Sequence, residues 1–146
     1  MFKKLMLFLG VLLMASAFAY AEEKFTISGE VIHSGDEDIH VSLLTYEAFK
    51  NYKKGRPPAP FTQIFKANPE RKKTGRTPFK FVGVPKGSYC IISFLDENKN
   101  GKMHYLGYHP TERECWFKDY IIGVPGWVNV RFEVDKDITG IELKYE

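Results

Sequence analysis

The chain has 146 residues, of which 44% are hydrophobic and 15% aromatic, and its formal net charge is +3 at pH 7. This length allows one domain with a real core, and apart from a proline cluster no low-complexity segment or internal repeat is present. The two cysteines form neither a C-x-x-C motif nor a cluster with histidine, which argues against redox catalysis and a zinc site.

Residues 1–21 are predicted to be a secretory signal peptide. Lys3 and Lys4 form a positive amino-terminal region, and residues 5–14 form an apolar stretch too short to span a bilayer comfortably. Ala19-Tyr20-Ala21 has the small-x-small pattern of a cleavage site. We therefore expect a bacterial protein that is periplasmic or secreted, with no transmembrane segment after cleavage. An uncleaved anchor is the alternative.

The remaining residues, 22–146, are expected to form a single domain. Apolar and polar residues alternate over short runs, which is the period of β-strands. We expect strands over residues 25–31, 39–43, 61–67, 78–85, 89–95, 103–108, 128–134 and 141–145.

Three connections interrupt this pattern. Residues 46–52 allow one helical turn, which Gly55 and the following prolines would end. Residues 68–77 are expected to form a polar, basic loop, and the segment around Trp116 to be an irregular connection. The run 89–95 is the most apolar and should be a central strand buried on both faces. Seven or eight short strands without a long helix favour a β-sandwich.

Cys90 and Cys115 are predicted to form one disulfide, because an even, minimal number of cysteines in an oxidising compartment favours pairing. The bond would close a loop of about 25 residues, which the chain-entropy model values at about 3 kcal/mol. Two thiols, one of them buried in a strand, are the alternative.

The turn Asp96-Glu97-Asn98-Lys99-Asn100-Gly101 begins as calcium loops of the D-x-[DN]-x-[DN]-G type do. Its twelfth position is Gly107, where an EF-hand has a bidentate glutamate. One interpretation is a weak calcium site; the other is a hairpin turn, since Asn and Gly tolerate left-handed backbone conformations. The calcium ligands would be the side chains of Asp96, Asn98 and Asn100, the Lys102 carbonyl, and Glu112 or Glu114.

These motifs together resemble a known family. The chain contains Phe25-x-Ile27-x-Gly29-x-Val31, then Phe79-x-Phe81-x-Gly83-Val84-Pro85-Lys86-Gly87, then Tyr89-x-Ile91 and the turn at 96–101. It is similar to an uncharacterised family of secreted bacterial β-sandwich proteins related to carboxypeptidase regulatory-like and transthyretin-like (prealbumin-like) domains. The resemblance implies a seven- or eight-stranded transthyretin-like sandwich that serves binding, adhesion or structural support. Met103-His104 stands where members carry an acid, which departs from the family's metal-site pattern.

Bases are concentrated between residues 50 and 80, where ten lysines and arginines accompany only Glu70. One interpretation is a patch that binds a polyanion or anionic lipid. The other is a solvated loop that protects a sheet edge. Nucleic acid is not an expected partner in this compartment. The residues of the predicted basic patch are Lys50, Lys53, Lys54, Arg56, Arg71, Lys72, Lys73 and Arg76.

Catalytic residues are not apparent. The serines 42, 88 and 93 lie outside any Gly-x-Ser-x-Gly motif, and the four histidines (33, 40, 104 and 109) lack metal-ligand spacing except for the last two. We expect a non-catalytic module of the cell envelope without a required cofactor, binding an envelope protein or glycan. The alternative is a hydrolase on a transthyretin-like scaffold, although the C-terminal Tyr-Arg-Gly-Ser of the hydroxyisourate hydrolases is missing. Trp116 and Trp127 would either pack in the core or contact a partner.

Overall fold

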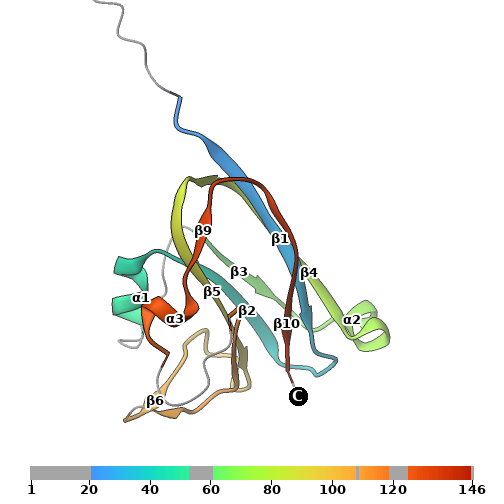
Figure 1. Ribbon diagram of the computed structural model, residues 1–146. Helices are drawn as coiled ribbons and strands as arrows, with labels where there is room; N and C mark the ends of the chain where they lie inside the picture. Colours follow the sequence, from blue (N-terminus) through green and yellow to red (C-terminus); the bar gives the residue numbers. More distant parts are fainter. Residues whose placement is uncertain (1–20, 53–60, 108, 119–124, 146) are drawn as a thin grey trace, which may run out of the picture.

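The structure, a computed structural model, describes residues 21–52, 61–107, 109–118 and 125–145. Most of these residues lie in strands, which confirms the expected all-β class and a sandwich of sheets (Figure 1). The predicted signal peptide, apart from Ala21, lies outside the described residues. The strands are β1 (Lys24–Ile32), β2 (Asp38–Leu44), β3 (Thr62–Phe65), β4 (Arg76–Pro85), β5 (Gly87–Asp96), β6 (Tyr105–Leu106), β7 (His109–Pro110), β8 (Glu114–Trp116), β9 (Phe132–Val134) and β10 (Ile138–Lys144). The helices are α1 (Tyr46–Tyr52), α2 (Pro69–Thr74) and α3 (Trp127–Val130).

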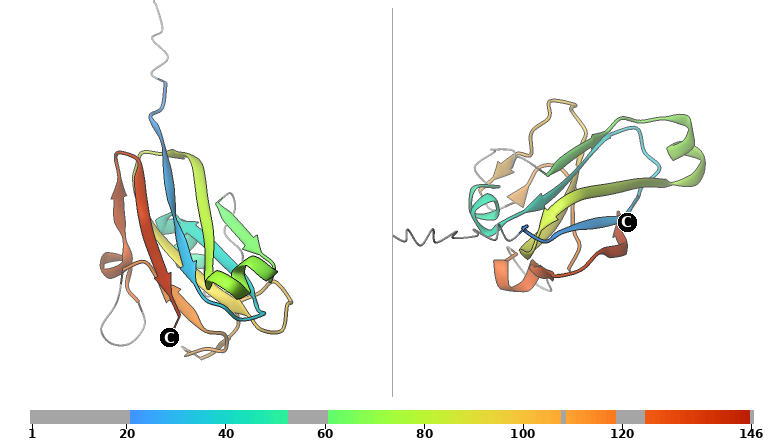
Figure 2. Two further views of the ribbon diagram at one scale, coloured as in Figure 1. Left: turned by 90° about the vertical axis from the view of Figure 1, so that its right-hand side faces the viewer. Right: turned by 90° about the horizontal axis from the view of Figure 1, so that it is seen from above.

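Two sheets stack on each other (Figure 2). The first, called the outer sheet, has the order β10-β1-β4. The second, called the central sheet, has the order β3-β2-β5-β8, and β9 pairs with the beginning of β5. β1 is antiparallel to β4 and parallel to β10, so the first and last strands of the domain lie side by side.

The space between the sheets holds the main hydrophobic core. Successive side chains of a strand point to opposite faces, so alternate residues of each strand turn inward. Burying this apolar surface is the main favourable contribution to folding. The core includes Ile27, Val31, Ile39, Val41, Leu43, Phe79, Phe81, Val84, Ile91, Leu95, Ile141 and Leu143.

The other face of the central sheet is also covered. α1, α3 and the segment around β6 lie on this side, opposite the outer sheet (Figure 1). A second cluster of buried residues joins them to the sheet: Leu44, Tyr52, Cys90, Ile92, Phe94, Met103, Trp116 and Val130. β5 is therefore buried on both faces, as predicted from its apolar run.

α2 replaces the loop that was expected over residues 68–77. The Asn68 side chain accepts a hydrogen bond from the Arg71 backbone N–H at 2.8 Å, Pro69 begins the helix, and Gly75 ends it with a φ of 66°. These are standard signals for the two ends of a helix. None of the described helices is long and apolar enough to cross a membrane.

The strand expected over residues 128–134 is only half correct. Residues 127–130 form α3, in which Val130 is buried and Val128 is 78% exposed, and the strand begins at Phe132. The segment at Trp116 was expected to be irregular, but residues 114–116 form β8 against β5. Of the predicted strand over residues 103–108, only Tyr105 and Leu106 pair.

Candidate functional site

Along the covered face of the central sheet, the buried side chains change from apolar at one end to ionisable at the other. At one end, Leu44, Cys90 and Ile92 belong to the second apolar cluster. At the other end, the same strands carry buried ionisable residues. Asp38, His40 and Asp96 have exposed fractions of 2%, 4% and 1%. Buried charges are rare unless they are paired and hydrogen-bonded, so this polar end is the candidate functional site.

His40 and Asp96 form the centre of this site. Their Nε2 and Oδ2 atoms are 3.2 Å apart, and the His40 ring stacks on Phe94 at a centroid distance of 4.4 Å. Burial lowers the pKa of His40, and the nearby carboxylate of Asp96 opposes this effect. Lys66 pairs with Asp38 on the neighbouring position of β2. The pair resembles a base held by an acid, as in many hydrolytic sites.

The turn after β5 is held by its own side chains. The Asp96 carboxylate accepts hydrogen bonds from the backbone N–H groups of Asn100 at 3.1 Å and Gly101 at 2.6 Å. The Asn98 side-chain oxygen also accepts the Asn100 N–H, and the Asn100 oxygen accepts that of Lys102. Lys99 and Gly101 have φ values of 57° and 77°, the left-handed conformation expected for this turn.

Glu112 closes the loop that this turn opens. It is 5% exposed and accepts hydrogen bonds from the His104 backbone N–H at 2.9 Å and from the Asn98 side-chain nitrogen at 3.3 Å. Its oxygens also contact the His104 ring and the Thr111 hydroxyl. Residues 97–107 and 109–113, which we call the hairpin loop, are thus tied to the end of β5 by the buried Asp96 carboxylate, and the buried Glu112 carboxylate joins the two arms of the loop to each other. The sequence suggested Glu112 only as a calcium ligand, and this anchoring role was missed.

The calcium interpretation can be compared with these contacts. Glu112 lies against the turn, whereas Glu114 accepts a hydrogen bond from the Trp116 indole at 3.1 Å and lies beside Tyr105. All three predicted side-chain ligands of the turn already accept backbone N–H groups. Each oxygen keeps a second lone pair, so the donor set is compatible with a cation. Within the described residues, however, no group of three or more His, Cys, Asp or Glu is arranged to hold a metal.

The tip of the hairpin loop is the short β6–β7 pair. Tyr105 lies opposite Pro110, and Leu106 lies opposite His109. Leu106 is 78% exposed, which ties it with Val128 for the largest exposure of the big apolar side chains in the described part. The hairpin loop, held by polar contacts at its base, therefore exposes an apolar side chain to solvent at its tip.

The predicted disulfide is absent between Cys90 and Cys115, and this prediction is wrong. Cys115 lies opposite Ser93 in the register of β5 and β8, three residues from Cys90. Residues three apart on a strand point to opposite faces, so the two thiols lie on different sides of the central sheet. Burial raises the pKa of Cys90 to about 12. The Cys115 thiol donates to the Lys144 carbonyl at 3.4 Å.

The described members of the predicted basic patch do not lie on one surface. Lys50 is on α1 and pairs with Glu47, whereas the other described members belong to α2 and the start of β4, on the opposite side of the molecule (Figure 1). Arg71 is only 1% exposed and donates to the backbone carbonyls of Gly35 and Glu37 at 2.9 and 2.6 Å, so it is unavailable to a ligand. Lys72 pairs with Asp36, Arg76 pairs with Glu30, and Lys53, Lys54 and Arg56 lie outside the described residues.

The serines 42, 88 and 93 bond to groups other than histidine. Ser42 bonds to Thr62 at 3.0 Å, Ser88 donates to Glu133 at 2.6 Å, and Ser93 accepts from the Tyr145 hydroxyl at 2.8 Å. Trp116 is buried in the second cluster, while Trp127 is half-buried between Tyr46 and Phe49. The core interpretation thus holds for Trp116.

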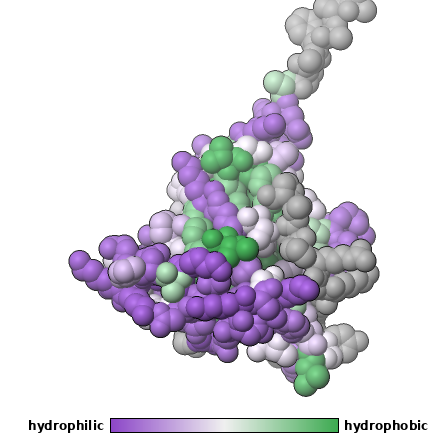
Figure 3. All heavy atoms as spheres, turned by 180° about the vertical axis from the view of Figure 1, so that it is seen from behind, coloured by the Kyte–Doolittle hydropathy of each residue, from purple (hydrophilic) through white to green (hydrophobic). Residues whose placement is uncertain are grey.

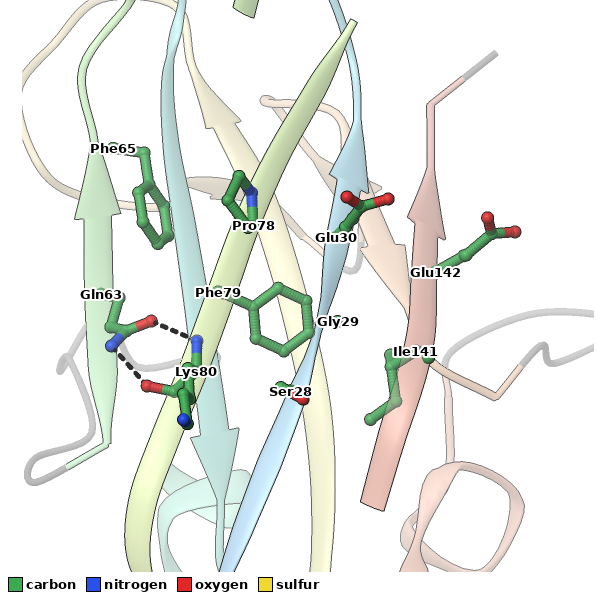
Figure 4. A pocket seen from close by; sticks show the side chains of 11 residues that line it. Ser28, Gly29, Glu30, Gln63, Phe65, Pro78, Phe79, Lys80, Ile141 and Glu142 are labelled. Atoms are coloured by element: carbon green, nitrogen blue, oxygen red, sulfur yellow. Dashed lines mark hydrogen bonds between the residues drawn. The ribbon is translucent and has the colours of Figure 1, made fainter. Parts of the chain in front are cut away.

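A pocket of about 670 Å³ lies away from this site, over the outer sheet and β3 (Figure 4). Its lining includes Ser28 and Glu30 of β1, Pro78 and Lys80 of β4, and Glu142 of β10. Seen from the side that carries β3, the surface is largely hydrophilic with separate hydrophobic patches (Figure 3). In this lining, the hydrogen bond from Lys144 lowers the pKa of Glu142.

Comparison with known proteins gives one match. A family model described as an uncharacterized protein conserved in bacteria (DUF2141) matches residues 30–142. These residues include the polar end of the central sheet and the whole hairpin loop. A comparison with curated proteins and one with solved structures found no significant match.

Proposed function

Since the chain belongs to the bacterial family DUF2141, we propose that it is an exported, non-catalytic module that binds a partner of the cell envelope through its hairpin loop. The partner is an envelope protein or glycan, and the location is the periplasm or the cell exterior. The observation that carries this proposal is the exposed Leu106 at the tip of a loop that one buried carboxylate, Asp96, ties to β5 and a second, Glu112, holds together internally.

Anchoring supports binding for an energetic reason. A loop that is already ordered loses little conformational entropy when it meets a partner, so more of the contact energy appears as affinity. Burying one leucine contributes roughly 1.5–3 kcal/mol, which is enough for a side chain at the tip to matter.

The proposal is tested by envelope retention. Wild-type protein, Leu106→Asp and the control Val82→Asp would be added to spheroplasts and envelope fragments of the producing cells, and the bound fraction measured by sedimentation. Val82 is 67% exposed on β4, outside the hairpin loop, so the control adds the same charge at a comparable exposure. We expect at least a fivefold loss of binding for Leu106→Asp and none for Val82→Asp. Equal retention of all three proteins would contradict the proposal.

The hydrolase alternative has the His40–Asp96 pair in its favour. Against it, Ser42, Ser88 and Ser93 are bonded to Thr62, Glu133 and Tyr145 rather than to His40, and His40 is buried against Phe94. Turnover of ester or amide substrates that disappears in His40→Gln, with folding intact, would favour the hydrolase.

We also propose that calcium binds the turn weakly, in the millimolar range typical of sites with few charged ligands. The supporting observation is the approach of Glu112 to Asn98, which brings a second carboxylate to the turn. Titration calorimetry with calcium should give heat for the wild type and none for Asp96→Ala. No heat at several millimolar calcium would end this proposal.

The finer fold assignment, a transthyretin-like sandwich, is likewise a proposal. It is supported by two stacked sheets of short strands in which the first and last strands are neighbours. Superposition of an experimental structure on transthyretin-like domains, strand by strand, is the test.

A further inference from the structure

Two end strands face each other on one side of the sandwich. β4 ends the outer sheet and β3 ends the central sheet. The Gln63 side chain of β3 reaches across and bonds the backbone of Lys80: its Nε2 donates to the Lys80 carbonyl at 2.9 Å, and its Oε1 accepts the Lys80 N–H at 3.3 Å (Figure 4). One side-chain amide therefore makes both hydrogen bonds that a residue of a neighbouring strand would make.

The edge of β4 has a second protection. In an antiparallel pair, residues whose N–H and C=O point away from the partner strand alternate with residues that bond to it. Lys80 lies opposite Ser28 and bonds outward to Gln63, so Pro78, two residues away in the regular part of the ladder, shares its orientation. Pro78 has no N–H to offer. Proline is a recognised device for blocking sheet edges.

Exposed apolar side chains lie around this edge and would favour its pairing with another chain. The described part of the chain has five large, exposed apolar side chains, and two of them, Ile64 at 53% and Val82 at 67%, lie on these two end strands. An extended edge with exposed apolar residues tends to pair with another chain. Lys80 is exposed and adds a charge at the same place.

We propose that Gln63 blocks dimerisation through the edge of β4. Its amide occupies the backbone hydrogen-bonding groups of Lys80 to which β4 of a second copy of this chain would otherwise bind. The occupant is a second copy because β4 is ten residues long and offers the same outward peptide groups, so antiparallel pairing about a twofold axis satisfies both edges at once. Lys80 would then lie near Lys80 of the other copy, and this like-charge contact weakens the association further.

The test is the oligomeric state of edge variants. Wild type, Gln63→Leu and the double variant Gln63→Leu/Lys80→Thr would be examined by sedimentation velocity between about 10 µM and 1 mM. We expect a monomeric wild type, a dimer for Gln63→Leu, and a dimer at least tenfold tighter for the double variant. Asn129→Leu, which adds an exposed leucine on α3, should stay monomeric.

A further variant distinguishes pairing along β4 from nonspecific hydrophobic association. Using Lys80→Pro in place of Lys80→Thr in the double variant removes the outward N–H of residue 80 and should restore the monomer. Gln63→Ala replaces Gln63→Leu if the leucine variant melts at a lower temperature than wild type. A Gln63→Leu/Lys80→Thr variant that stays monomeric at 1 mM, a dimer that survives Lys80→Pro, or a wild type that is already dimeric through this edge would each overturn the proposal.

Discussion

The two ends of the covered face of the central sheet lie on the same two strands but are stabilised differently. The end at Leu44 and Ile92 is apolar and packs against α1, α3 and Trp116. The end at His40 and Asp96 is built from buried ionisable groups that fasten the hairpin loop. One end contributes by removing apolar surface from water, and the other contributes order, because a satisfied polar network allows few alternative arrangements.

The largest expected effect is at the apolar end. Ile92→Ala removes a 1%-exposed side chain from the second cluster and should lower the free energy of unfolding by about 2–5 kcal/mol, through lost burial and the cavity that remains. Urea denaturation monitored by circular dichroism measures it. Val128→Ala, at a 78%-exposed position on α3, is the control and should change little. A loss below 1 kcal/mol would show that this layer is not packed as described.

A loss of similar or slightly smaller size is expected at the polar end. Asp96→Ala removes the acceptor of two backbone N–H groups and the partner of His40, which should cost about 2–4 kcal/mol. The same denaturation experiment measures it, with Glu97→Ala, an exposed neighbour, as the control. If Asp96→Ala were as mild as the control, the polar end would contribute no stability.

Glu112→Gln should act locally. The amide keeps the size of the side chain but loses the charge that receives the His104 N–H, at a cost of about 1–2 kcal/mol. Hydrogen exchange should accelerate in residues 97–113 and stay unchanged in β2 and β5. Uniform acceleration over the whole domain would show that the hairpin loop does not open as a separate unit.

A smaller change in the free energy of unfolding is expected from pH, and it arises at the polar end, where His40 lies. The folded-state pKa of His40 is lowered, so the unfolded chain binds more protons once the pH falls below about 6.5. Stability contributed by neutral His40 is thus present above that pH and is lost as the pH falls toward the folded pKa. Wild type should lose stability between pH 7.5 and 5.5 by less than about 1.4 kcal/mol per pH unit. His40→Gln should have a flatter profile, and an identical profile would contradict this assignment.

The smallest expected effect is that of a reductant. Since Cys90 and Cys115 lie on opposite faces of the central sheet, dithiothreitol should leave the melting temperature unchanged. Titration of the unfolded protein with Ellman's reagent should then find two thiols. A drop of several degrees on reduction would restore the disulfide and require a different register for β8.

Sequence reasoning succeeded where one physical signal dominated. The apolar run at residues 89–95 predicted a strand buried on both faces, and the left-handed backbone expected of the turn at 96–101 is present at Gly101, although its other left-handed residue is Lys99 rather than an asparagine. It failed where local signals competed. The basic composition of residues 68–77 hid the Asn68-Pro69 and Gly75 signals of α2, and the alternation of Val128 and Val130 imitated a strand although both lie in a helix.

The errors at the site have a different origin, because they concern contacts between distant residues. The disulfide was inferred from the number of cysteines, but the register that places Cys115 opposite Ser93 decides which face each thiol occupies. Likewise, nothing near Glu112 in the sequence shows that its carboxylate is buried against His104 and Asn98.

The neighbouring positions of β1 and β10 affect the order in which the domain can be completed. Gly29 lies so close to Ile141 that a Cβ on it would be 2.2 Å from the Ile141 carbonyl oxygen, and the two residues are more than a hundred positions apart. Because the ribosome makes the chain from its amino terminus, β1 emerges first and β10 last. The outer sheet can then begin as β1 with β4, but its third strand is added only when nearly the whole chain has emerged. Until that moment, one edge of β1 is open to other chains.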